Sequence, residues 1–174
     1  GTKHQQFVSG ISIPSYWIGT YFSDIMLGLP ASGAVVGLIY ALDVDYLQGD
    51  ATMPLFLSLI LFVSSAIAAS YLLHFLFKSP GKAQFVTILF NILLGSVFVS
   101  VSAALQSAGG AGTAEQMGQY VRVLPVFLLG ENIWNIVNQA FNGGHHSYWD
   151  YDVTSRNIYY MIYESLGYFL LALI

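Results

Sequence analysis

Cysteine is absent from this 174-residue sequence, and charged side chains are scarce. Without cysteine the chain has neither a disulfide framework nor a thiolate metal site. Only 8 % of its residues are charged, whereas about 25 % is usual for a soluble domain. The five Lys and Arg residues are scattered and the net charge is −4, so no basic patch exists for a nucleic-acid backbone. These absences exclude nucleic acid as a partner and argue against a soluble domain.

Long apolar stretches are what the sequence has instead. Hydrophobic residues make up 56 % of the chain, and residues 25–42, 51–77 and 83–114 contain no Asp, Glu, Lys or Arg. Each stretch reaches the roughly 17 to 25 residues that a helix needs to cross a bilayer. The sequence therefore predicts an all-α, polytopic helical bundle, that is, a multi-pass integral membrane protein.

The apolar pattern divides the chain into spans and connections. We expect a short cytosolic segment over residues 1–15, followed by spans at about 16–42, 53–77, 84–106 and 156–174. Pro30 predicts a kink in the first span, because proline removes a backbone donor. The chain opens without a signal-peptide pattern and ends inside an apolar run, so we expect it to be an internal fragment of a longer protein.

A re-entrant hairpin is predicted at about residues 121–141. The apolar run that ends at Gly130 would cover only about 12 Å, which is too short to cross. After Gly130, apolar residues recur every three or four positions and polar residues lie between them, which is the pattern of an amphipathic helix. We therefore expect a Gly-rich polar connection over 107–119 and then two short segments, one containing Pro125, that meet at a break at Gly130 and dip into the outer leaflet. A fifth span is the alternative.

Basic residues predict the orientation. Lys3, Lys78 and Lys82 lie on one side of the predicted topology, and the acidic loop 43–50 has no basic residue. Because cytosolic loops are enriched in Lys and Arg, the N-terminal segment is expected in the cytosol.

Three polar residues fall inside predicted spans: Asp24, Asn91 and Glu164. A carboxylate in a membrane is usually paired or faces water, so Asp24 and Glu164 are candidates for a proton or substrate site. For both acids, structural pairing is the favoured interpretation: Asp24 near the cytosolic interface, and Glu164 beside tyrosine hydroxyls of its own helix. Gly33 and Gly37 form a GxxxG pair, which favours close helix packing over a channel lining.

No catalytic or metal site is predicted. The only candidate ligands in a group are His145, His146, Asp150 and Asp152, and a solvated loop explains them better, because their spacing matches no defined zinc site. No phosphate-binding loop, nucleophile elbow or metalloprotease helix is present.

Ordered short motifs along nearly the whole chain resemble the transmembrane domain of the A subfamily of ATP-binding cassette (ABC) transporters. The opening runs K-H-Q-Q-F-V-S-G over residues 3–10 and is followed by Tyr16-Trp17 and then Asp24. The remaining motifs are, in order, Tyr71, Phe75, Phe77 and Lys78; Phe90-Asn91-Ile92 and Gly95; Leu124-Pro125 and Leu129-Gly130; Trp149-Asp150; Arg156-Asn157; and Glu164.

The resemblance implies a partial transmembrane domain of an ABC exporter of the ABC-2-like (type V) class. It also implies that the parent protein moves lipids, with ATP and Mg bound in a nucleotide-binding domain outside this chain and a second transmembrane domain as a partner. The cytosolic segment would contact the nucleotide-binding domain through residues that match the family's opening motif: Lys3, His4, Gln6, Phe7 and Gly10.

Departures from the family pattern concern the substrate more than the fold. They are Ser23 in place of a frequent tryptophan, Phe62-Val63-Ser64 and Ala68 in the second span, and Asn132 in place of a second glycine. Two other functions stay open. An ion-coupled carrier or channel would use Asp24 and Glu164, and a non-transporting scaffold would bind a partner helix through Gly33 and Gly37.

Overall fold

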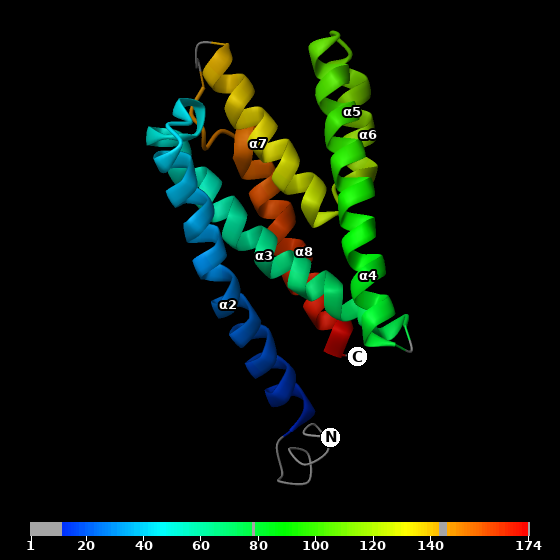
Figure 1. Cartoon of the computed structure of the whole chain (residues 1–174). Helices are drawn as coiled ribbons and strands as arrows, with labels where there is room; N and C mark the ends of the chain where they lie inside the picture. The colour runs from blue at the N-terminus through cyan, green and yellow to red at the C-terminus, as the bar shows by residue number, and fades with distance from the viewer. Residues whose placement is uncertain (1–11, 78, 143–145, 174) are drawn as a thin grey trace.

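The computed structural model describes residues 12–77, 79–142 and 146–173. Within these ranges the secondary structure is helical and no strand occurs, which confirms the predicted all-α class (Figure 1). The elements are, in chain order, α2 (Ile13–Ala41), η1 (Asp45–Leu47), η2 (Gly49–Ala51), α3 (Thr52–Phe75), α4 (Pro80–Phe90), η3 (Asn91–Gly95), α5 (Ser96–Ser107), α6 (Ala111–Val121), α7 (Pro125–Phe141), η4 (Tyr151–Ser155) and α8 (Arg156–Leu173).

Three helical stretches are long and apolar enough to cross a membrane: Pro14–Ala41, Gly49–Phe75 and Gly81–Ser107. They coincide with the first three predicted spans. The third is built from α4, the π-helical turn η3 and α5, and it runs upward in Figure 1 after α3 has run downward. The π turn begins at Asn91, whose side-chain amide donates to the Thr87 carbonyl one turn earlier at 2.8 Å.

Local sequence explains where the first span begins. The Ser12 hydroxyl accepts from the Ser15 backbone N–H at 3.3 Å, and proline occupies the first turn, where it needs no hydrogen-bond partner. Helix α2 then continues through Pro30 without interruption.

The last helix, α8, packs along α3 and runs back toward the level at which α2 begins (Figure 1). Its 18 residues correspond to about 27 Å of rise. Because it contains polar residues such as Arg156 and Glu164, α8 is less apolar than the three stretches named above and is not one of them. The fourth span therefore stays a prediction.

The hairpin differs from its prediction in where the chain turns. Helix α7 passes through Gly130 without a break, and the reversal lies at residues 122–124, directly before Pro125. The expectation of a break at Gly130 is therefore wrong, as is that of a non-helical connection over 107–119, because α6 begins at Ala111. In Figure 1, α6 descends beside α5 and α7 rises again from about half the height of the bundle. This shape is that of a re-entrant hairpin, whose depth in a membrane stays a prediction.

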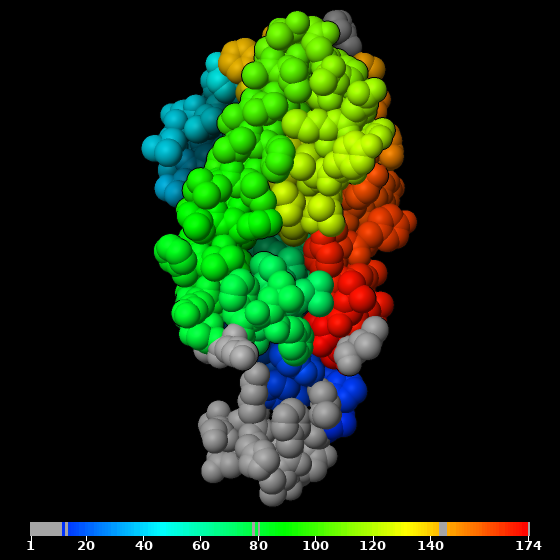
Figure 2. All heavy atoms as spheres, turned by 90° about the vertical axis from the view of Figure 1, so that its right-hand side faces the viewer, coloured from blue at the N-terminus to red at the C-terminus, as the bar shows by residue number. Residues whose placement is uncertain are grey.

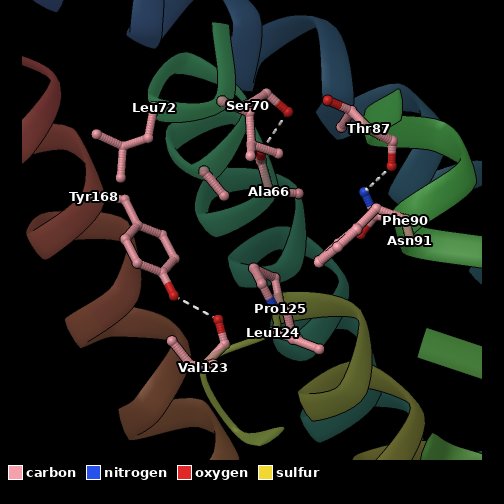
Figure 3. Close-up of a pocket in the computed structure, with 12 residues that line it drawn as sticks. Ala66, Ser70, Leu72, Thr87, Phe90, Asn91, Val123, Leu124, Pro125 and Tyr168 are labelled. Carbon is pink, nitrogen blue, oxygen red and sulfur yellow. Dashed lines mark hydrogen bonds between the residues drawn. The ribbon is translucent and has the colours of Figure 1, made fainter. Parts of the chain in front are cut away.

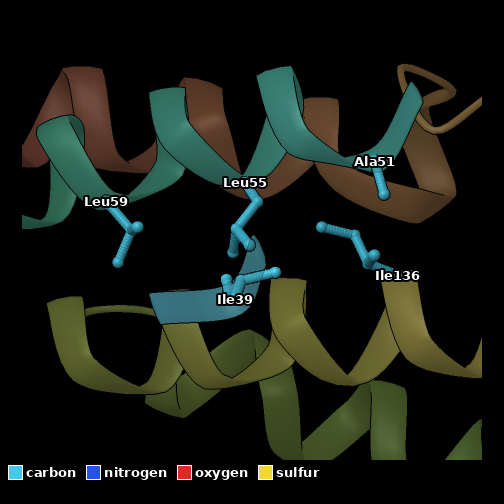
Figure 4. Close-up of a cluster of buried hydrophobic side chains, with 5 residues drawn as sticks. All are labelled: Ile39, Ala51, Leu55, Leu59 and Ile136. Carbon is cyan, nitrogen blue, oxygen red and sulfur yellow. The ribbon is translucent and has the colours of Figure 1, made fainter. Parts of the chain in front are cut away.

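A small apolar core fixes α7 to the first two spans. Ile39 at the end of α2, Leu55 and Leu59 in α3, and Ile136 in α7 are buried together with Ala51 (Figure 4). The returning half of the hairpin is thereby held at the end of the bundle opposite the start of α2.

Candidate functional site

Four charged side chains form a closed cluster where α6, α7 and α8 meet; we call Glu115, Arg122, Glu131 and Arg156 the charge cluster. Arg122 donates to both carboxylates in two forks. Its Nη1 and Nη2 lie 2.7 and 2.8 Å from the Glu115 oxygens, and its Nε and Nη2 lie 3.0 and 2.8 Å from those of Glu131. Arg156 reaches Glu115 at 3.1 Å and Glu131 at 3.4 Å.

The charge cluster is neutral, and its centre is closed to solvent. The side chains of Arg122 and Glu131 are only 2 % and 4 % exposed, whereas that of Glu115 is 43 % exposed. The hydrogen bonds from Arg122 hold the pKa of Glu115 below its ordinary value. Bidentate pairs of this kind fix geometry as well as charge, so the cluster sets the position of both hairpin helices against α8.

Gly118 explains how the Arg122 side chain fits. A Cβ built at Gly118 would lie 2.9 Å from Arg122 Nη2, so the guanidinium lies directly over this glycine. Gly118 thus serves the packing of the Arg122 side chain against α6.

An apolar cavity of about 240 Å³ lies directly below the hairpin turn; we call it the central pocket (Figure 3). Its lining comes from α3, from α4 and η3, from the hairpin turn and from α8: Ala66, Ala69, Ser70, Leu72, Leu73, Thr87, Phe90, Asn91, Val123, Leu124, Pro125 and Tyr168. The surface is hollowed here, and atoms of α3 are visible between α4 and α8 below the turn (Figure 2). An apolar cavity of this size takes apolar groups in preference to water.

Three polar side chains of the central pocket, those of Tyr168, Ser70 and Asn91, form hydrogen bonds within the protein. The Tyr168 hydroxyl donates to the Val123 carbonyl at 2.5 Å and so holds the hairpin turn against α8 (Figure 3). Ser70 and Asn91 each bond to a carbonyl one turn earlier in their own helices. Of the predicted site residues, Asn91 and Pro125 line this pocket; Pro125 also opens α7.

The two predicted intramembrane acids lie on different helices, Asp24 on α2 and Glu164 on α8, and differ in surroundings. Asp24 accepts a hydrogen bond of 2.6 Å from the Tyr71 hydroxyl, among aromatic rings that include Trp17 and Tyr21. Glu164 is buried on α8, one turn before Tyr168 and close to the central pocket. Its two oxygens form no hydrogen bond of normal geometry within the described ranges.

Gly33 and Gly37 face away from the other described residues. Both are exposed, and a Cβ built at either meets no atom within 4 Å. Their role in helix packing stays a prediction that needs a segment beyond the described residues. Close approach occurs elsewhere: a Cβ at Gly130 would lie 2.4 Å from Val99 Cγ2, and one at Gly95 would lie 2.5 Å from Val126 Cγ1.

The predicted coupling residues, Lys3, His4, Gln6, Phe7 and Gly10, lie outside the described part of the chain. His146 and Asp150 form an exposed pair at 3.3 Å, and no group of three His, Asp or Glu side chains suited to a metal occurs in the described part of the chain.

Sequence reasoning missed the charge cluster. The signal was available, because Arg122 and Arg156 are the chain's only arginines and lie within or beside a predicted membrane segment. Such residues are expensive in a membrane unless paired.

Three apolar stretches long enough to cross a bilayer and a helical hairpin packed against them define a multi-pass membrane domain. The chain belongs to the family described as "ABC-2 family transporter protein", which it matches over residues 1–174.

Similar curated proteins agree with this assignment. The chain is 27 % identical to human "Retinal-specific phospholipid-transporting ATPase ABCA4" over 99 % of its own length and 8 % of that protein's. It is 33 % identical to rat "Phospholipid-transporting ATPase ABCA3" over 58 % of its length and 6 % of the relative's. Rat "ATP-binding cassette sub-family A member 7" is 25 % identical over 99 % of the chain and 8 % of that protein. The resemblance to the A subfamily is thereby confirmed, and the chain spans about 8 % of the length of its full-coverage relatives.

Proposed function

We propose that this chain forms part of the membrane domain of an ATP-driven transporter that moves phospholipids across or out of a membrane. The observation that carries the proposal is the central pocket, which is apolar, lies at the hairpin turn and opens between α4 and α8. Two of the similar proteins are named as phospholipid-transporting ATPases, which supports the same substrate class. ATP and Mg would be bound by a nucleotide-binding domain, and a second transmembrane domain would complete the transporter.

The pocket suits part of an acyl chain. Its aliphatic and aromatic lining offers no free charge, and its volume of about 240 Å³ accepts a short apolar segment. Because the Tyr168 hydroxyl ties the hairpin turn to α8 across the pocket, a shift of α8 would change the pocket's shape.

Filling the pocket tests this function. In the full-length protein reconstituted in vesicles, Ala69→Phe is expected to raise the phospholipid concentration for half-maximal ATPase stimulation about tenfold, since overfilling a packed site typically costs about 1–3 kcal/mol. Ala69 lines the pocket. The matched control is Ala104→Phe, at an exposed position of α5, which should leave the stimulation unchanged.

Unchanged stimulation in Ala69→Phe would argue against the pocket as a lipid site. Substrate transport that is driven by a proton gradient without ATP, and that is lost in Glu164→Gln, would instead support the ion-coupled carrier.

We further propose that the segment 3–10 transmits closure of the nucleotide-binding domain to the helices. In this mechanism closure pushes the segment, the helices shift as a unit, and a lateral groove changes its openness to lipid. Phe7→Ala in the full-length protein should keep the basal ATPase rate but lose most of the transport per ATP hydrolysed. Normal coupling of transport to hydrolysis in this variant would contradict the role.

A further inference from the structure

A second cavity lies beside the charge cluster and shares no lining residue with the central pocket; we call it the outer polar cavity. It has a volume of about 420 Å³ and is enclosed by the end of α5, by α6 and α7, and by the start of α8. Its lining residues are Gln106, Ala111, Glu115, Glu131, Asn135, Asn138, Asp152 and Arg156. Seven of these eight side chains are polar or charged, so the cavity offers hydrogen-bonding groups where the central pocket offers apolar ones.

Two charged groups of the lining lack a hydrogen-bond partner among the described residues: the Asp152 carboxylate and the Nε–H of Arg156. Glu115 and Glu131 are paired with the two arginines. The Asp152 carboxylate has neither an ion pair nor a side-chain hydrogen bond with the residues that the structure describes; only its backbone carbonyl accepts one, from Asn135. Arg156 retains a buried Nε–H without an acceptor in the same part of the chain. Asp152 lies in η4, and Arg156 follows four residues later as the first residue of α8.

Charge balance favours a ligand with both signs. The charge cluster is neutral, so Asp152 leaves the surroundings of the cavity with one net negative charge at neutral pH. The net negative charge would repel a purely anionic group. A simple cation would leave the Nε–H of Arg156 without an acceptor. A zwitterion satisfies both groups.

The cavity also lies at the right level of the bundle. It is formed where α5 ends and α8 begins, at the end that the lysine distribution predicts to be the outer side, away from the start of α2 (Figure 1). Lys82, the remaining Lys or Arg of the described ranges, lies at the other end, in the first turns of α4. Among the described residues, a lipid phosphate at the outer end would therefore find its cation in the charge cluster.

Building on the proposed phospholipid transport, we propose that the outer polar cavity binds the zwitterionic headgroup of a phospholipid from the outer leaflet. The ammonium group lies against the carboxylates of Asp152 and Glu115, and the phosphate accepts from Arg156. Phospholipids with an ammonium group are thereby preferred over purely anionic ones.

Asp152→Asn tests the assignment with little risk to the fold, because the carboxylate has no partner among the described residues. The full-length protein is reconstituted in nanodiscs of phosphatidylglycerol with increasing phosphatidylethanolamine, and ATPase stimulation is measured. The phosphatidylethanolamine fraction for half-maximal stimulation should rise about fivefold, the upper range for one accessible ion pair. The matched control, Asp45→Asn, removes an exposed carboxylate from the 43–50 loop and should leave this fraction unchanged.

Three results would overturn the inference. The first is a wild-type headgroup preference in Asp152→Asn, although the wild-type protein is stimulated by lipid. The second is equal competition by soluble phosphorylethanolamine, which would assign the cavity to a free solute. The third is a wild-type protein that no phospholipid stimulates, which would remove the proposed function itself.

Discussion

Arg122→Met is expected to destabilise the full-length protein by about 3–5 kcal/mol, the typical cost of breaking a buried ion pair from one side. The substitution removes four hydrogen bonds to Glu115 and Glu131. Glu131, whose side chain is 4 % exposed, would keep only the 3.4 Å contact with Arg156. Its carboxylate would thus stay buried with too little compensation. The free energy of unfolding, measured by denaturant titration in mixed micelles, checks this.

A second substitution distinguishes two causes of the lower stability: the unpaired charge of Glu131 and the lost packing of the Arg122 side chain. In Arg122→Met/Glu131→Gln the orphaned charge is gone, so we expect the double variant to recover about 2 kcal/mol relative to the single one. Lys82→Met is the control, because Lys82 is exposed and should change the stability little. A single variant as stable as wild type, or a double variant no better than the single, would show that the charge cluster does not hold the hairpin.

The spans could be predicted because one physical rule determines them. A helix that crosses a bilayer needs a long run of apolar residues, and residues 51–77 provide one without any charged side chain. The same rule works poorly for α8, where Arg156 and Glu164 break the run although the helix packs along α3. Its neighbours stabilise these residues, and neighbours cannot be read from a single segment.

The hairpin turn was misplaced because glycine has two uses in a helix. Gly130 suggested a break, since glycine weakens an isolated helix by roughly 1 kcal/mol. In the structure the missing side chain makes room for Val99 of α5, so tertiary packing outweighs the local preference. Pro125 was the better signal, because proline is favoured in the first turn of a helix.

The charge cluster could be anticipated only in part. Arginine in or beside a membrane segment predicts that a partner exists, but Glu115, Glu131 and Arg156 come from three helices. Their meeting depends on the turn at residues 122–124, which the sequence had not located. Asp152 and Arg156 likewise line one cavity with α6 and α7 only in the folded chain.

Gly130→Ala is expected to destabilise the protein by about 2 kcal/mol, within the range that overpacking typically costs. A Cβ at Gly130 would lie 2.4 Å from Val99 Cγ2, and one at Gly95 would lie 2.5 Å from Val126 Cγ1. In each helix the glycine and the valine are four residues apart and share a face. Two valines therefore enter two glycine sites of the facing helix, and because valine is stiff at χ1 in a helix it yields little.

The reciprocal arrangement allows a test by exchange. Val99→Ala removes the methyl groups that the new Cβ of Gly130→Ala would meet, so the double variant should be more stable than Gly130→Ala alone, as measured by the same denaturant titration. Gly112→Ala in α6 is the matched control, since its Cβ meets no atom within 4 Å, and it should be neutral or slightly stabilising. If Val99→Ala instead added its full cost to that of Gly130→Ala, α5 and α7 would not be in contact at this site. The hairpin would then be held by the charge cluster, the Tyr168 hydrogen bond and the packing of Ile136 in the small apolar core.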